Sequence, residues 1–182
     1  FSDNFTDSIN GYAKYLDIES FVDWYLINEI TKNADAIFYT SCYMHLARNG
    51  KLKMGPLWDF DLAFGGYRFD EPAADICNNP EGFWIKNVMW YTRLFQDPYF
   101  VQRVKDRFEF FYSNRDSVYS RLYKGHDCLK EFIYEENSRW FQLCDETYSS
   151  QHVTDFYAQE AELIENWLEQ RFQWLKVQFS SL

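Results

Sequence analysis

Three aspartates in the N-terminal part of the chain have a spacing that suits a site for chemistry. Asp35 directly follows a helical pattern, and Asp59 and Asp61 stand together in the stretch Trp58-Asp59-Phe60-Asp61. Carboxylates can take different roles in one site, since one can accept a proton while another holds a metal ion. Whether Asp35 and Asp59 meet depends on the segment between them.

A predicted β-hairpin separates Asp35 from Asp59. Residues 41–46 suit a short strand, and Lys51 to Met54 suit the return strand. Between them Asn49-Gly50 predicts a type I′ turn, because such a turn needs two residues with positive φ. Since a hairpin folds its two ends back together, we expect Asp35 and Asp59 to lie close in space.

This expected arrangement is the one that protein kinases use. There, one aspartate takes the proton of the acceptor hydroxyl, a hairpin follows, and a second aspartate holds Mg²⁺ on the nucleotide phosphates. Phosphoryl transfer depends on charge neutralisation and positioning, so two carboxylates with separate roles suit it. The alternative is that Asp35 caps a helix or turn, while Asp59 and Asp61 are solvated loop acids.

The composition indicates one domain with a sizeable core. The chain has 182 residues, 47% of them hydrophobic and 21% aromatic, which predicts a single domain over residues 1–182. Its formal net charge of −10 argues against binding to nucleic acid. No apolar run is long enough for a transmembrane segment. Because the chain starts at Phe1 without Met, we expect it to be a piece of a longer protein.

The cysteines and histidines do not favour a metal centre. The four cysteines form no C-x-x-C pair, and their number leaves two disulfides and four free thiols both open. The three histidines have no ligand spacing, and no hydrolase, zinc-protease or P-loop signature occurs. The residues concerned are Cys42, Cys77, Cys128, Cys144, His45, His126 and His152.

Local signals predict one helix before the hairpin and a loop after it. Asp17 suits the N-cap of a helix from Ile18 to Lys32, with Leu16 and Phe21 at the spacing of a hydrophobic staple. Residues 67–82 have loop character, and their acids are either solvated or extra ligands of a metal site. The loop's breakers are Pro72, Asn78, Asn79 and Pro80, and its acids are Asp70, Glu71 and Asp75.

The remainder of the chain predicts helices, with its aromatic residues in the core. The expected fold is mainly α with one short β-hairpin near 41–54, in which residues 17–66 form a helix–hairpin–WDFD unit and residues 83–182 a helical bundle. The predicted helices are 84–95, 98–112 capped by Asp97, 114–123 ended by Gly125, 128–148 capped by Asp127, and a last helix capped by Thr154.

Two long stretches of the sequence resemble the CotH kinase family. They read DIESFVDWY–NEITKNAD over residues 17–35 and NGKLKMGPLWDFDLAFG over residues 49–65. A looser similarity continues through DPYF at 97–100 to Trp167-Leu168 and Arg171, so it covers nearly the whole chain. The family is named for a bacterial spore-coat protein and resembles atypical protein kinases of the secretory-pathway kind. The similarity therefore implies that this chain is the C-lobe-like half of a kinase-like fold.

The resemblance also implies roles for individual residues. Asp35 matches the catalytic aspartate, Asp59 the metal-binding aspartate, and Asp61 a second candidate metal ligand. Thr40 and Ser41 are candidate contacts for phosphate or metal. The implied cofactors are Mg²⁺ or Mn²⁺ and ATP, and the implied substrates are Ser or Thr hydroxyls of exported or surface proteins. The same resemblance implies an extracytoplasmic or cell-surface location.

The sequence departs from the kinase pattern in two ways. No Asn stands shortly after Asp35 to hold a second metal ion, since the first amide is Asn49 in the turn, and nothing matches the nucleotide-gripping lysine of the N-terminal half. We therefore expect this portion to need the preceding half of its parent chain for phosphate transfer. A non-catalytic pseudokinase or surface-assembly module is the alternative. A D-x-D sugar-nucleotide site at Asp59 and Asp61 has less support, because no βαβ unit accompanies it.

Overall fold

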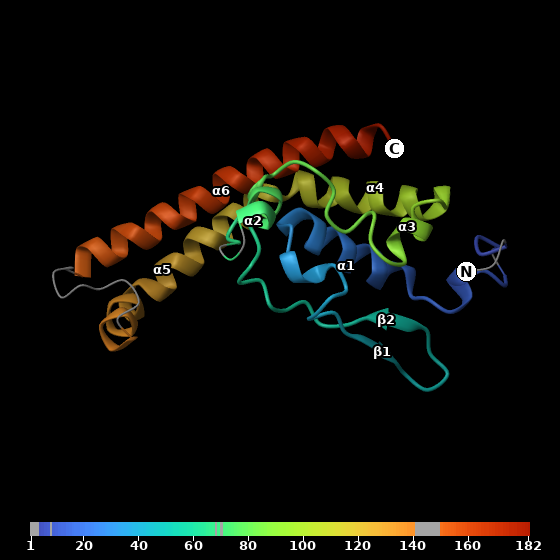
Figure 1. The fold of residues 1–182 in the computed structure, drawn as a ribbon, viewed down its shortest axis with the longest axis horizontal. Helices are drawn as coiled ribbons and strands as arrows, with labels where there is room; N and C mark the ends of the chain where they lie inside the picture. The colour runs from blue at the N-terminus through green and yellow to red at the C-terminus, as the bar shows by residue number, and fades with distance from the viewer. Residues whose placement is uncertain (1–3, 8, 68, 70, 141–149) are drawn as a thin grey trace.

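The computed structural model describes residues 4–7, 9–67, 69, 71–140 and 150–182. Over these ranges the chain is mainly helical with one two-stranded antiparallel sheet, which confirms the predicted class. Helix α6 runs along α5 and α4, α1 packs against α4 and α6, and the hairpin projects away from this helical body (Figure 1). The elements are α1 (Ile18–Thr31), β1 (Met44–Leu46), β2 (Leu52–Met54), α2 (Glu71–Asn78), α3 (Tyr91–Leu94), α4 (Pro98–Ser113), α5 (Arg115–Trp140) and α6 (Ser150–Ser180).

Helix α1 begins at the predicted cap and lies in the centre of the core. The Asp17 carboxylate accepts a hydrogen bond from Ser20 N at 3.0 Å, and Leu16 and Phe21 are both buried, as the staple requires. The helix ends one residue before the predicted boundary, because Lys32 takes a left-handed conformation with φ 48°. Since α1 is apolar on most of its surface, it can be covered by α4, α6 and the hairpin together.

The hairpin forms where predicted, but its turn is of another kind. Met44 pairs with Met54 and Leu46 with Leu52, which leaves a five-residue connection from Ala47 to Lys51. Gly50 N donates to Ala47 O, and only Asn49 has a positive φ, of 62°. A type I′ turn needs two such residues, so that prediction is wrong. The Asn-Gly pair nevertheless lies at the tip, where asparagine tolerates the left-handed conformation.

Residues 67–82 are not only loop, because helix α2 occupies 71–78. Pro72 was read as a helix breaker, yet it lies in the first turn, where a missing N–H costs nothing. The asparagine and proline signals do end this helix. Asn78 then pairs with the main chain of Tyr67 through two hydrogen bonds of 2.9 Å, which closes the segment on itself.

The predicted helix 84–95 is also wrong, since only its last part, α3, is helical. The reason is a tertiary contact from α1. The buried carboxylate of Glu29 accepts hydrogen bonds from the main-chain N–H groups of Trp84, Ile85 and Lys86 at 2.6, 2.8 and 3.0 Å. These three amides are therefore satisfied without a preceding helical turn, which leaves residues 83–90 free to follow an irregular path.

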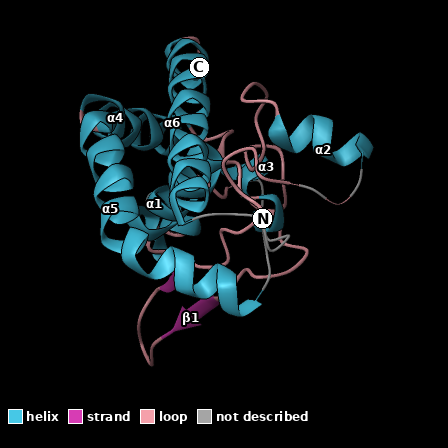
Figure 2. Cartoon of the chain, turned by 90° about the vertical axis from the view of Figure 1, so that its left-hand side faces the viewer, coloured by secondary structure: helices cyan, strands magenta, loops and turns pink. Residues whose placement is uncertain are grey.

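The prediction of two helices after Asn114 is corrected to one, α5, which passes through Gly125 and Asp127 without a break. Helix α6 begins at Ser150, so Thr154 lies inside it and does not cap it. The two helices run antiparallel and form an arm beyond the core (Figures 1 and 2). Packing between them offsets the cost of glycine in a helix. The part of predicted helix 128–148 after Trp140 lies outside the described residues.

Side chains from α1, from Lys32 directly after it and from α6 fix the segment 76–86. The Arg171 guanidinium, fully buried, pairs with Glu29 at 2.7 Å and donates to the carbonyls of Pro80 and Gly82. Lys32 Nζ donates to three more carbonyls, those of Ile76, Asn79 and Glu81 at 2.6–2.7 Å. Trp167 Nε1 donates to Asn78 O at 2.6 Å. Buried charges are tolerated only with such complete hydrogen bonding.

The state of the cysteines and the search for membrane-spanning helices concern the described residues only. Cys42, Cys77 and Cys128 are free thiols there, and Cys144 lies outside them. No described helix has both the length and the apolar character needed to cross a membrane, as predicted.

Candidate functional site

Two main-chain hydrogen bonds bring the aspartates together. Phe64 N donates to Thr31 O at 2.8 Å, and Ala34 N donates to Leu62 O at 3.3 Å. The segment after the hairpin is thereby tied to the end of α1 and to the short turn that follows it. The hairpin alone was expected to bring Asp35 to Asp59, but these two bonds do so as well, and no pattern in the sequence indicates them.

Asp35 lies in a single 3₁₀ turn, Ala34–Ala36, which Asn33 caps. The Asn33 side chain accepts a hydrogen bond from Asp35 N at 3.3 Å and donates to Asn28 Oδ1 at 3.2 Å, and its carbonyl accepts from Trp84 Nε1 at 2.7 Å. Asn33 is buried, and these three hydrogen bonds fix its position. The alternative reading of Asp35 as a cap is therefore wrong, because Asn33 does that work and leaves the Asp35 carboxylate available.

The Asp35 carboxylate is electrostatically coupled to the other two aspartates. Partial burial raises the pKa of Asp35, and the negative charges of Asp59 and Asp61 raise it further. A raised pKa makes a carboxylate a stronger base. The charges of Asp59 and Asp61 thus lie within electrostatic reach of the Asp35 carboxylate.

Ser41 links the start of the hairpin to the Asp59 carboxylate. Ser41 Oγ donates to Asp59 Oδ2 at 2.6 Å, and Thr40 Oγ1 lies 2.9 Å from Ser41 Oγ. Trp58 Nε1 donates to Ser41 O at 3.0 Å, which fixes the same corner from the segment that follows β2. Both hydroxyls singled out from the sequence therefore belong to the Asp59 network, although neither contacts Asp35 in a described hydrogen bond. The role of Trp58 was not foreseen.

Uncommon backbone conformations gather around this corner. Phe38, Ser41, Asp59 and Phe64 all have positive φ, between 54° and 63°. For residues other than glycine such angles are uncommon, and for a bulky phenylalanine they are outliers. Strained residues persist where the surrounding structure imposes them, and they cluster at functional sites. The sequence carries no signal for this strain, because none of these positions is glycine.

The carboxylates of Asp59 and Asp61 fit one mode of metal binding. Both residues are exposed. Within the described residues no three His, Cys, Asp or Glu side chains converge on a point where they could hold a metal ion. Mg²⁺ is commonly held by one or two carboxylates together with water and substrate phosphates, without a complete protein cage. Asp59 and Asp61 suit that mode, and Asp75 of α2 adds no third ligand.

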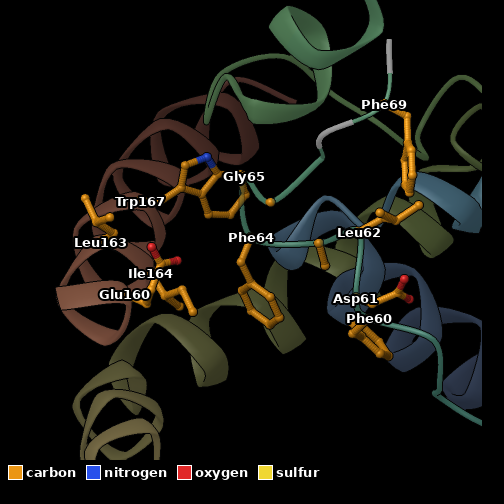
Figure 3. A pocket seen from close by; sticks show the side chains of 12 residues that line it. Phe60, Asp61, Leu62, Phe64, Gly65, Phe69, Glu160, Leu163, Ile164 and Trp167 are labelled. Carbon is orange, nitrogen blue, oxygen red and sulfur yellow. The ribbon is translucent and has the colours of Figure 1, made fainter. Parts of the chain in front are cut away.

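A mainly apolar cavity of about 610 Å³ begins at Asp61. It lies between residues 60–66 and helix α6 (Figure 3). Gly65, with φ 76°, approaches the Trp167 ring so closely that a Cβ there would lie 2.8 Å from Trp167 Cδ1. Trp167 was predicted as core, and it is buried, but it also forms a wall of this cavity.

Comparisons with known proteins identify the family of this chain. A family model described as CotH kinase protein matches residues 2–175. No curated protein and no solved structure matches the chain. The match spans both stretches that carry the resemblance, together with the helices that support them. The chain belongs to the CotH kinase family.

Proposed function

We propose that this chain is the catalytic, C-lobe-like part of a protein kinase that transfers phosphate from ATP to Ser or Thr hydroxyls. The observation that carries the proposal is that Asp35 lies within electrostatic reach of Asp59 and Asp61 across the hairpin. Partial burial raises the pKa of Asp35, and these two charges raise it further. In this role Asp35 accepts the proton of the attacking hydroxyl. Membership of the CotH kinase family supports a kinase-like protein in general.

Asp59 and Asp61 are proposed to hold Mg²⁺ or Mn²⁺, and the ion when bound neutralises charge on the nucleotide phosphates. Ser41 supports Asp59 in this role, since its hydroxyl binds Oδ2 of the carboxylate, and no described hydrogen bond occupies Oδ1. Thr40 extends the same network and is proposed to contact phosphate. Positioning of this kind supplies most of the rate in phosphoryl transfer.

The acceptors and the location are proposed from the family alone. We infer exported or surface proteins as substrates and an extracytoplasmic or cell-surface location. The part of the parent chain that grips the nucleotide is proposed to lie outside this sequence.

A non-catalytic assembly module is the second candidate. The observation that favours it is that no amide side chain occurs from Ala36 to Ser41, whereas a kinase has an Asn five positions after its catalytic Asp to hold a second metal ion. In that case the Ser41–Asp59 bond only stabilises a fold inherited from active relatives.

The deciding experiment measures transfer of the γ-phosphate from ATP with Mn²⁺ by the full-length protein. Asp35→Ala and Asp59→Ala should each reduce the rate by orders of magnitude, because positioning and charge stabilisation carry the reaction. Asp75→Ala, at an exposed acid on α2, is the matched control and should leave the rate unchanged. Binding of Mn²⁺-ATP without transfer would favour a pseudokinase, and no nucleotide binding would favour the assembly module.

A further inference from the structure

Strand β1 has an unpaired outer edge beside the proposed active site. The sheet holds β1 and β2 alone among the described residues, so β1 has a neighbour on one side only. The far side of β2 is covered by the chain before α1. Leu52 N donates to Tyr15 O at 2.8 Å, and Asp17 N donates to Leu52 O at 2.9 Å.

The register shows which groups of β1 point outward. Gly55 N donates to Tyr43 O, so Tyr43 and His45 face β2 with their main-chain groups. Met44 and Leu46 alternate with them and turn their N–H and C=O groups to the free edge. Leu52, the partner of Leu46, turns its own groups away from β1 in the same manner, to Tyr15 and Asp17. No described residue bonds to the outward groups of Met44 and Leu46.

The side chains at this edge are apolar, and the charges around them are positive. Tyr43 is 54% exposed and Leu46 is 65% exposed. No Asp or Glu occurs from residue 36 to residue 58, although the whole chain carries a net charge of −10. Arg48, Lys51 and Lys53 lie in this stretch. Lys53 pairs with Asp17 at 3.2 Å, whereas Arg48, at the tip, has no partner among the described residues.

The strand leads directly to the aspartates. Ser41, which binds Asp59, stands three positions before Met44, a distance of about 10 Å along an extended chain. The ring of Tyr43 lies 5.5 Å from the ring of Trp58, next to Asp59. The edge therefore has a neutral-to-acidic end at the proposed active site and a basic end at the turn.

We propose that β1 binds the acceptor protein as an added strand. The occupant is an extended segment with acidic residues near Arg48 and a Ser or Thr near Asp35, paired antiparallel through the outward groups of Met44 and Leu46. Strand addition gives affinity through the main chain and specificity through alternate side chains. The role as acceptor site rests on the proposed kinase function, whereas the peptide-binding edge itself does not.

A second copy of this chain fits the edge less well than such a peptide. No acid occurs between residues 36 and 58, so the β-hairpin of a second copy would bring no carboxylate of its own to Arg48. A peptide with acidic residues at that end does so, and opposite charges across a strand pair are stabilising. Charge complementarity at Arg48 therefore favours an acidic peptide.

The probe is a fluorescein-labelled peptide, Glu-Glu-Val-Thr-Val-Thr-Gly-Ser, whose binding to this chain is followed by anisotropy. Arg48→Glu should weaken binding about fivefold or more, while Arg121→Glu, at an exposed arginine on α5, should not change it. Met44→Pro should abolish binding, because proline lacks the outward N–H, and it is tolerated at a strand edge. Met44→Ala keeps that N–H and should still bind. Circular dichroism and Tm verify that each variant is folded.

Further outcomes decide the proposal. A peptide N-methylated at alternate residues should not bind if the main chain makes the contacts. Equal binding of that peptide, or no effect of Met44→Pro, would overturn the proposal, as would a concentration-dependent dimer that Met44→Pro dissociates. Phosphate transfer by the full-length protein without edge-dependent binding would overturn the docking site alone. Edge-dependent binding without any transfer would overturn the kinase function and leave the docking site.

Discussion

Two regions of this chain are held in opposite ways. Residues 76–86 are fixed by buried charges: Lys32 and Arg171 donate to five of their main-chain carbonyls, and Glu29 accepts from three of their amides. Asp35 and Asp59 are more exposed and have fewer bonds, and Asp59 lies in a left-handed conformation. One region uses its charges to hold the chain, while the other leaves its charges available.

The difference shows that this fold uses its polar groups in two ways. A buried charge is stable only when every hydrogen-bonding group has a partner, so the network around Arg171 has no capacity left for a ligand. At the aspartates, repulsion between like charges is uncompensated by any basic side chain in a described ion pair. A cation would relieve that repulsion, so the comparison supports a binding role for the aspartates and a structural role for Arg171.

The largest loss of stability should come from breaking the buried ion pair between Arg171 and Glu29. Arg171→Met leaves the Glu29 carboxylate buried without its partner, which costs about 3–5 kcal/mol of the free energy of unfolding. In thermal unfolding we expect a drop in Tm of about 10 °C or more. Arg107→Met, at the half-exposed pair with Asp23, should cost less than about 1 kcal/mol.

A double variant tests the reason for this effect. Glu29→Gln combined with Arg171→Met removes both charges, but Glu29 also serves three main-chain amides, so we expect only partial recovery of Tm. Full recovery would show that the pair acts only through its own charges. A Tm of Arg171→Met equal to that of Arg107→Met would contradict the structural role.

The outcome of this comparison also explains what could be predicted from the sequence. Helices α1 and α4 were predicted nearly to the residue, because Asp17 and Asp97 cap them with local hydrogen bonds to Ser20 N and Tyr99 N. The hairpin likewise follows from a local signal. Each of these features is encoded by residues a few positions apart.

The predictions that were wrong concern segments whose conformation depends on residues far away in the sequence. Residues 84–86 look helical by pattern, but Glu29, more than fifty positions earlier, takes their amides. Gly125 looks like a break, but packing of α5 on α6 keeps the helix continuous. At the site, the sequence indicated the aspartates and the two hydroxyls, whereas the cap by Asn33 and the bond from Trp58 appear only in three dimensions.

Lys32 allows the role of buried charges around residues 76–86 to be tested through the pH dependence of the free energy of unfolding. Burial lowers the pKa of Lys32 to about 8, from 10.5 in the unfolded chain, and the neighbouring charge of Arg171 adds to this effect. Between these values the unfolded chain binds more protons, so this group makes the fold more stable as pH rises. Lys32→Met, which also loses three hydrogen bonds, should cost about 2–3 kcal/mol at pH 7.5.

The pH dependence distinguishes a buried lysine from an ordinary one. We expect the difference in free energy of unfolding between wild type and Lys32→Met to grow from pH 7.5 to pH 9.5 in urea titrations. Comparison with the variant cancels the contribution of the buried tyrosines, whose pKa values are raised. A difference independent of pH would mean that Lys32 is not desolvated.

The smallest effect on stability should appear at Asp35, whose carboxylate is available. Removal of this charge should stabilise the fold. Because the pKa of Asp35 is raised above its unfolded value of 3.8, the folded state binds more protons just above that pH, and this residue lowers stability as pH rises. Asp35→Asn should therefore raise Tm at pH 7, by about 1–2 °C given that the group is partly exposed. The gain should shrink as the pH falls toward 3.8.

The control for this variant is Asp75→Asn on α2, an exposed acid, which should leave Tm unchanged. If Asp35→Asn stabilises the fold while it removes phosphate transfer, the carboxylate is kept at a cost to stability, as expected of a functional residue. If instead it lowers Tm, Asp35 resembles Glu29 and holds the structure together. The two regions would then differ in burial only, and the case for a catalytic role of Asp35 would fail.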